Sequence, residues 1–238
     1  MLQGNLSVGG RQAKWAFTDR LDGVSLPPYA SNNLAAHVGD DARHVRANRE
    51  QLQARFDGGE LSWMGPVHGV DLALIDAATA ITPNVDALAT SRARTPLVTL
   101  GGDCVPVLVA AGELVVAAHV GWRGLVDGMT ARIMAVLARH GIAGHDAQVL
   151  LGPGICGACY GIPEERARLV RAACPEAVVP ARNGDPGADI RVGLQAQWQA
   201  EGAHVELVGG CTFESQHYFS HRREGITGRQ AGVIGWVA

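Results

Sequence analysis

Residues 99–124 read TLGGDCVPVLVAAGELVVAAHVGWRG. Two apolar runs, Val105–Val109 and Leu114–Ala118, flank a turn of small residues at 110–113. Apolar runs of this length on either side of a short turn are typical of a β-hairpin.

The hairpin predicts that a thiol and an imidazole lie close together. With the turn centred between Ala111 and Gly112, Cys104 lies directly across from His119. Cross-strand partners have Cβ atoms about 5 Å apart and point to the same face. Such a pair suits either a shared metal ion or Cys–His proton transfer, and the spacing alone does not choose between them.

Composition favours one large domain without a nucleic-acid or membrane partner. The 238 residues are 47% hydrophobic, enough for a full core. The net charge of -3 gives no attraction to nucleic acid or anionic lipid. The sequence lacks the apolar run of a signal peptide or a membrane helix, so we expect a cytoplasmic protein. Five cysteines without a regular framework indicate free thiols or metal ligands.

Helical and strand patterns alternate without a regular βαβ repeat, which predicts an α+β fold, a single domain over residues 1–238 with mixed β-sheets flanked by helices. Residues 1–14 are polar and glycine-rich, and we expect a loosely ordered start. The expected helices are 42–56, ended by Gly58 and Gly59, then 125–140, 163–173 and 190–201. Besides the hairpin, strands are expected at 61–64, 72–75, 149–151 and 205–208, and at the end of the chain.

Several polar residues outside the hairpin could take part in chemistry. His68, in the turn GPVHGVD, is the best third ligand, because one Cys and two His with an open fourth position commonly hold catalytic zinc. Asn33 and His37 lie in a long shaped loop, and such loops are often functional. Arg123 follows a strand and opens a helix, where an anion can bind. An isolated Cys or His is more often an ordinary core or surface residue.

Cys156 and Cys159 form a C-x-x-C half-motif within GPGICGACYG. There is no second pair, and the surrounding glycines suit a tight turn, so a purely structural role is favoured. The same stretch lacks the G-x-G-x-x-G spacing of a dinucleotide-binding loop.

Five separated motifs together resemble a known family. They are NNLAAHVGDD (32–41), GDCVPVL (102–108), AAHVGWRGL (117–125), LGPGICGACYGIPEE (151–165) and CTFESQHYFSHRREGITGR (211–229). In this order they resemble the bacterial YfiH / multicopper polyphenol oxidase (laccase) domain family, which is related to FAMIN. The resemblance extends from about Trp15 to Trp236.

The resemblance implies a mononuclear zinc or copper site formed by His68, Cys104 and His119. It also implies phosphorolysis of adenosine, inosine and methylthioadenosine, together with adenosine deamination. A laccase activity is a weaker implication, because the chain lacks the several His-x-His motifs of true multicopper oxidases. The chain departs from the family where Pro66 replaces a Gln and where Cys156 and Gly161 replace a Gly and a Glu, which affects the expected substrate range.

The sequence thus predicts a zinc-dependent purine nucleoside enzyme, with copper as the alternative metal and purine nucleosides and phosphate as the partners. Arg123 would hold phosphate, and Asn33 and His37 would contact substrate or transfer protons. One alternative is a cysteine hydrolase of amide or peptidoglycan peptide bonds, with Cys104 as nucleophile and His119 as base. Another is a copper-dependent polyphenol oxidase (laccase).

Overall fold

The predicted hairpin lies in the middle of a six-stranded sheet. The computed structural model describes residues 1–56 and 59–237. In chain order the hairpin strands are β8 (Val105–Ala111) and β9 (Leu114–Val120), and every residue of both is buried. Across this sheet the strands are β13 (His204–Leu207), β10 (Ala147–Leu151), β8, β9, β6 (Ala87–Thr90) and β4 (Leu72–Leu74).

The hairpin is confirmed, but its predicted register is wrong. The turn is formed by Gly112 and Glu113, so His119 lies opposite Pro106 and not opposite Cys104. Gly112 has a φ of 52°, a left-handed conformation that glycine adopts readily, and this places the turn one residue later than predicted. Because side chains alternate along a strand, Cys104, two residues before Pro106, still lies on the face of His119.

A second six-stranded sheet packs against the first. Its strands, in spatial order, are β1 (Leu2–Val8), β2 (Arg11–Phe17), β14 (Gln230–Trp236), β7 (Leu97–Gly101), β3 (Ser62–Gly65) and β5 (Thr82–Pro83). A small two-stranded sheet pairs β11 (Val178–Pro180) with β12 (Pro186–Ala188). Parallel and antiparallel pairs occur in both large sheets, as the predicted mixed sheets require.

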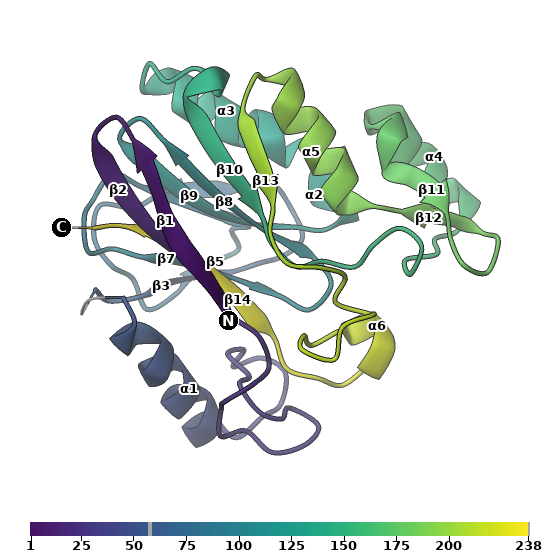
Figure 1. Cartoon of the computed structure of the whole chain (residues 1–238), viewed down its shortest axis with the longest axis horizontal. Helices are drawn as coiled ribbons and strands as arrows, with labels where there is room; N and C mark the ends of the chain where they lie inside the picture. Colours follow the sequence, from purple (N-terminus) through teal and green to yellow (C-terminus); the bar gives the residue numbers. More distant parts are fainter. Residues whose placement is uncertain (57–58, 238) are drawn as a thin grey trace.

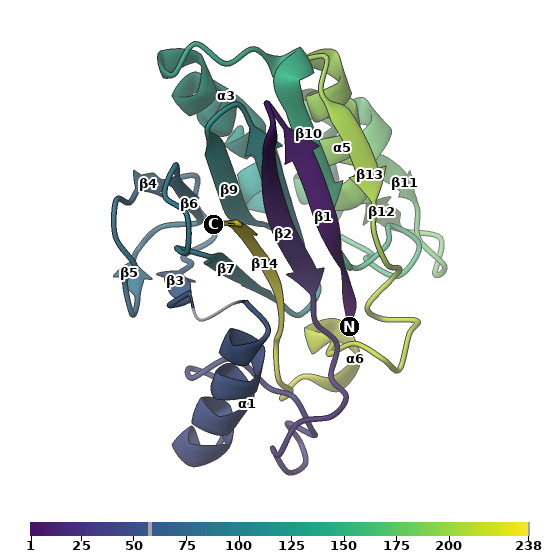
Figure 2. The same ribbon diagram turned by 60° about the vertical axis from the view of Figure 1, so that its left-hand side comes forward.

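Three groups of buried apolar side chains hold the elements in layers. One fills the space between the two sheets and includes Phe17, Leu108 and Ile234. Another lies between the hairpin sheet and the helices α3 (Met129–Arg139) and α5 (Ile190–Ala200), and a third joins α1 (Ala42–Ala54) to the outer face of the other sheet. Figures 1 and 2 show α1 on one side of the sheets and the remaining long helices on the other. The α+β single domain is as predicted.

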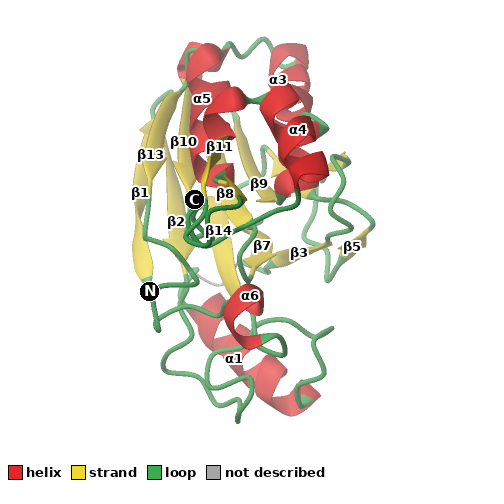
Figure 3. Ribbon diagram, turned by 90° about the vertical axis from the view of Figure 1, so that its right-hand side faces the viewer, coloured by secondary structure: helices red, strands yellow, loops and turns green. Residues whose placement is uncertain are grey.

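The helices are mostly those that the sequence predicts, with one interruption. Their bounds are α1 (Ala42–Ala54), α2 (Trp122–Val126), α3 (Met129–Arg139), α4 (Glu164–Ala173), α5 (Ile190–Ala200) and α6 (His221–Glu224). Figure 3 shows α3, α4 and α5 together at one end of the molecule and α6 at the opposite end, near α1. The single helix predicted over 125–140 is wrong, because Gly128 has a φ of 86° and separates α2 from α3. Of the two glycines expected to end α1, Gly58 lies outside the described residues.

The expectation of a loosely ordered start at residues 1–14 is also wrong. These residues form most of the antiparallel hairpin β1–β2, which pairs from Leu2 opposite Phe17 to Val8 opposite Arg11. Its turn is Gly9–Gly10, with both residues at positive φ, as a two-residue turn of type I′ requires. In the sequence, the apolar residues Leu6 and Val8 alternate with polar residues directly before these two glycines, a pattern that indicates a strand leading into a hairpin turn.

None of the helices within residues 1–56 and 59–237 combines the length and apolar character needed to cross a membrane.

Candidate metal centre and pocket

The turn that carries His68 is organised by one buried carboxylate. The side chain of Asp86 accepts hydrogen bonds from the backbone N–H groups of Val67, His68 and Gly69, at 3.2, 2.9 and 2.8 Å. The backbone carbonyl of the same residue accepts from the N–H of His119 at 2.8 Å. His68 has a φ of 62°, so these bonds support an unusual backbone conformation. Asp86 therefore joins the two histidines that the sequence proposes as ligands.

The structure brings the three proposed ligands together. The ligand atoms of His68, Cys104 and His119 lie within 4.8 Å of one another. The two imidazole rings meet edge to face, with centroids 4.9 Å apart. His119 is only 7% exposed, and neither of its ring nitrogens has a hydrogen-bond partner among the described residues. Buried imidazole nitrogens without partners, beside a thiol, form a donor set that fits a thiophilic divalent metal ion.

Burial makes the thiol and the imidazole of this cluster neutral. Desolvation, with added repulsion from Asp103, raises the pKa of Cys104 to about 12. Desolvation and the neighbouring His68 lower the pKa of His119 to about 3. A thiolate–imidazolium pair is therefore disfavoured at neutral pH, whereas neutral imidazole is the form that binds metal.

Space for the cluster depends on the absence of a side chain at Gly121. A Cβ atom at this position would lie 3.0 Å from the sulfur of Cys104 and 3.7 Å from the ring of His68. The residue ends the hairpin and begins α2, and its φ of -96° is accessible to other amino acids. Its small size therefore matters here for space rather than for backbone conformation.

The cluster forms part of the wall of a pocket of about 620 Å³. Arg123, Arg222 and Arg229 also line this pocket. The apolar part of the pocket wall is formed by Leu100, Ile155, Tyr160 and Ile190. The volume lies within the range of small-molecule sites, and the pocket combines metal-type donors, cations and apolar surface.

The arginines differ in how firmly they are held. Arg229 donates to the carbonyls of Thr227 and Gly228, at 2.9 and 2.8 Å. Arg222 lies over the ring of Tyr160, and Arg123 over the ring of Trp122, at 4.9 and 4.6 Å from the centroids. Arg123 forms no ion pair within the described part of the chain, so its charge is available to an anion.

Of the two loop residues predicted to act on substrate, only His37 lines the pocket. Desolvation at the wall, followed by the charges of Arg229 and Arg49, lowers its pKa. Asn33 is completely buried. Its side-chain N–H₂ donates hydrogen bonds to the carbonyl of Ala35 and the carboxylate of Asp40, and its side-chain oxygen accepts one from the backbone N–H of Arg229. The structure therefore gives Asn33 no direct contact with a substrate, because its side chain holds the backbone behind the pocket.

Sequence reasoning also missed Asp103, which connects the hairpin to the C-terminal segment. One carboxylate oxygen accepts from the hydroxyls of Thr212 and Ser220, at 2.6 and 2.7 Å, and the other accepts from the N–H of Arg222 at 2.7 Å. Its position directly before Cys104 was the available signal. No spacing rule could have found Asp86, because its partners lie far from it in the sequence.

Comparison with known proteins identifies the family. The sequence model described as multi-copper polyphenol oxidoreductase laccase matches residues 14–237, and this chain belongs to that family. The resemblance predicted from the motifs is confirmed.

Named relatives extend over nearly the whole chain. Over 233 residues it is 40% identical to a purine nucleoside phosphorylase of Streptomyces coelicolor, covering 94% of this chain and 96% of the relative. Over 228 residues it is 33% identical to the purine nucleoside phosphorylase YfiH of Escherichia coli, covering 92% and 91%. The crystal structure of protein NMB0706 from Neisseria meningitidis has a TM-score of 0.87 at 28% identity, covering 100% of this chain and 99% of that one.

Proposed function

We propose that this chain is a zinc-dependent purine nucleoside phosphorylase. Its substrates would be adenosine, inosine and methylthioadenosine, with adenosine deamination as a second reaction in the same pocket. The main support is one pocket that combines the His68–Cys104–His119 cluster with three arginines and an apolar wall. The names of the Streptomyces coelicolor and Escherichia coli relatives support the same reaction class.

The residues of the pocket have distinct proposed roles in phosphorolysis. A phosphate oxygen attacks C1′ of the ribose, the bond from C1′ to the purine nitrogen breaks, and ribose 1-phosphate and the free base leave. Arg123 and Arg229 bind the phosphate, because guanidinium groups match its oxygens in charge and geometry. His37, whose lowered pKa leaves the imidazole neutral at pH 7, accepts a proton from the attacking phosphate, and this proton passes to the departing purine nitrogen.

The three clustered residues would hold the metal ion. Zinc bound by His68, Cys104 and His119 supplies a Lewis acid at the pocket wall. The Asp86 carboxylate keeps the turn of His68 in position, and burial keeps His119 neutral and ready to bind metal.

The two alternative functions have weaker support. A cysteine hydrolase needs a reactive thiolate, but burial raises the pKa of Cys104 to about 12 and lowers that of His119 to about 3. A multicopper oxidase needs several copper sites with His-rich ligands. Within the described residues only one donor cluster contains histidine.

The test is to incubate zinc-replete protein with adenosine, with and without phosphate, and to identify the products by mass. We expect adenine and ribose 1-phosphate only when phosphate is present, and inosine in both cases, with part of the inosine converted to hypoxanthine when phosphate is present. Cys104→Ser and complete chelation should each abolish both reactions, whereas Cys174→Ser, which is not part of the pocket wall, should change neither. Full activity of the metal-free protein would rule out the zinc mechanism.

A further inference from the structure

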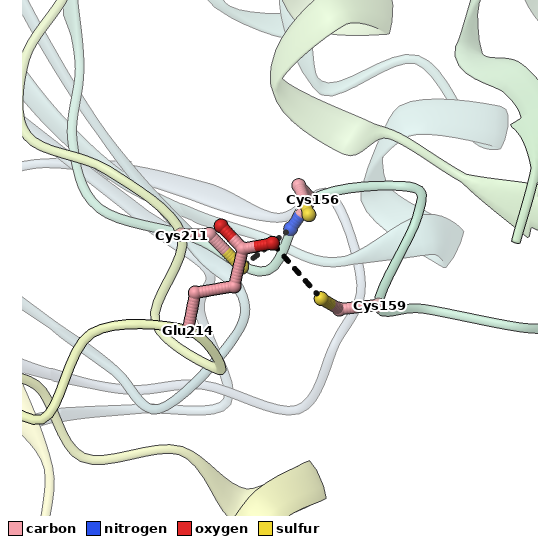
Figure 4. A group of neighbouring side chains, drawn as sticks. All are labelled: Cys156, Cys159, Cys211 and Glu214. Carbon is pink, nitrogen blue, oxygen red and sulfur yellow. Dashed lines mark hydrogen bonds between the residues drawn. The ribbon is translucent and has the colours of Figure 1, made fainter. Parts of the chain in front are cut away.

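A second donor cluster lies outside the pocket just described. Cys156 and Cys159 come from the loop between β10 and α4, and Cys211 and Glu214 come from the segment between β13 and α6. Their sulfur and carboxylate oxygen atoms lie within 4.8 Å of one another. Figure 4 shows the four side chains converging from these two segments. None of the four residues belongs to the wall of the pocket that holds His68.

The distances in this cluster are close to those of a tetrahedral metal site. Zinc–sulfur bonds of about 2.3 Å place the ligands of a tetrahedral zinc ion roughly 3.8 Å apart. The observed upper limit of 4.8 Å therefore requires a contraction of about 1 Å. The sulfur of Cys159 lies 3.6 Å from Oε1 of Glu214, and the backbone N–H of Cys156 donates to the sulfur of Cys211 over 3.3 Å.

The charges around the cluster suit three thiolates and a carboxylate around a dication. Such a site has a net charge of about -2, which needs nearby positive groups. Arg182 forms an ion pair with Glu214. Arg191 is also close enough to Asp189, Cys211 and Cys156 to interact with them electrostatically, and its Nε is buried without a hydrogen-bond partner in the described part of the chain. All five cysteines are free thiols, so no disulfide competes for these sulfurs.

We propose that Cys156, Cys159, Cys211 and Glu214 form a second, structural site for a thiophilic divalent cation such as zinc. Four protein donors complete a tetrahedral shell, so this site has no open position for substrate. The C-x-x-C pair is therefore half of a site whose other half is supplied by a distant segment.

Such an ion would connect the loop between β10 and α4, which lines the substrate pocket, to the segment that leads from β13 into α6, and Arg222 of α6 lines the pocket as well. Tyr160 directly follows Cys159, and Arg222 lies over its ring and donates to the carbonyl of Gly161 at 3.3 Å. The two segments already touch where the N–H of Thr212 donates to the carbonyl of Gly154 at 3.1 Å. The second ion would hold the pocket wall in shape without taking part in the reaction.

The first test measures the number of zinc ions bound per protein chain. Protein saturated with zinc under reducing conditions and freed of weakly bound ions should hold about two zinc ions per chain. Cys104→Ser should retain about one, and Cys156→Gly or Cys211→Ser should also retain about one, whereas Cys174→Ser should retain both. A Cys104→Ser protein that binds no zinc would overturn the proposal. A wild-type protein that holds a single ion, lost in Cys211→Ser and kept in Cys104→Ser, would support it while contradicting the proposed catalytic site.

A second test needs no variant and so does not depend on the folding of one. In the wild-type protein, alkylation followed by mass spectrometry should find Cys156, Cys159 and Cys211 protected by zinc and modified after chelation. Equal modification in both states, or a disulfide between two of these residues in freshly reduced protein, would overturn the proposal.

Discussion

Asp86 is the residue on which the geometry of both histidines depends, because its carboxylate fixes the turn of His68 and its carbonyl bonds the strand at His119. Asp86→Asn replaces one acceptor oxygen with an amide N–H₂ that faces backbone donors. We expect zinc affinity at the His68 cluster to fall about 10–100-fold, the usual effect of losing a residue that orients metal ligands. Competition with a chromophoric chelator measures this, and exposed Asp76→Asn serves as the control. Unchanged affinity in Asp86→Asn would contradict the role.

Gly121 leaves space beside the clustered ligands Cys104 and His68, and this leads to a second prediction. Gly121→Ala introduces a Cβ 3.0 Å from the sulfur of Cys104, closer than ordinary contact, although the backbone accepts alanine. The protein should fold with little change in melting temperature, but its zinc affinity at this cluster should fall at least about tenfold because the ligands are pushed apart. Gly210→Ala is the matched control, since a Cβ there meets nothing within 4 Å. Normal zinc binding by Gly121→Ala would show that the cluster tolerates the displacement.

The sequence could predict that Cys104 and His119 lie close together because alternation along a strand survives this error in register, whereas His68 was proposed from its residue type and from the family resemblance. The turn lies one residue later than predicted, which changes the pairing across the hairpin by two residues. Because this shift is an even number of residues, Cys104 and His119 stay on one face. The roles of Asp86 and Asn33 could not be predicted in this way. Each acts through hydrogen bonds to backbone groups that the fold brings close, and no periodicity marks such groups.

At the scale of elements, α6 and its flanking turns are held by the carboxylate of Glu224. It pairs with Arg20 and Arg223 and accepts a hydrogen bond from the hydroxyl of Thr227. Burial alone would raise its pKa, but the bonds from Thr227, Arg20 and Arg223 outweigh that effect and lower the pKa below 4.5. The ionised carboxylate therefore stabilises the fold above about pH 4.5, and this contribution is lost as the pH falls through the lowered pKa.

Glu224→Gln tests this linkage. We expect the free energy of unfolding to fall by about 1–3 kcal/mol at pH 7, because charged partners lose their carboxylate. The difference from the wild type should shrink progressively below pH 4.5. Denaturant titrations at several pH values measure it, with the exposed Glu164→Gln as the control. A constant difference down to pH 2 would contradict the assigned pKa direction.

Elements were predicted well where periodicity was strong and poorly where glycine controlled the backbone. The helices α4 and α5 begin and end within one residue of the prediction. By contrast, Gly128 divides one predicted helix into two. Gly9 and Gly10 form the turn of a hairpin where the sequence was expected to be loosely ordered. Both errors arise because glycine can either end an element or form a tight turn inside one.

At the scale of the whole molecule, the two donor clusters join segments from distant parts of the sequence. His68 lies between β3 and β4, Cys104 lies before β8, and Cys211 lies near the end of the chain. Residues so far apart are not held together in the unfolded chain, so metal binding should favour the folded state. The second cluster could not be predicted from the sequence, because it is the pairing of β10 with β13 in the folded protein that brings its two halves together.

Zinc should therefore raise the melting temperature of the whole protein. At a free concentration about 100 times the dissociation constant, one site adds about 2.7 kcal/mol to the free energy of unfolding. For a chain of 238 residues this corresponds to roughly 5–10 °C. Calorimetry with zinc and after chelation measures the shift. Cys104→Ser should keep part of it through the second cluster, and Cys104→Ser combined with Cys211→Ser should lose it entirely. A shift that persists in the double variant would mean that zinc stabilises the protein through groups other than these two clusters.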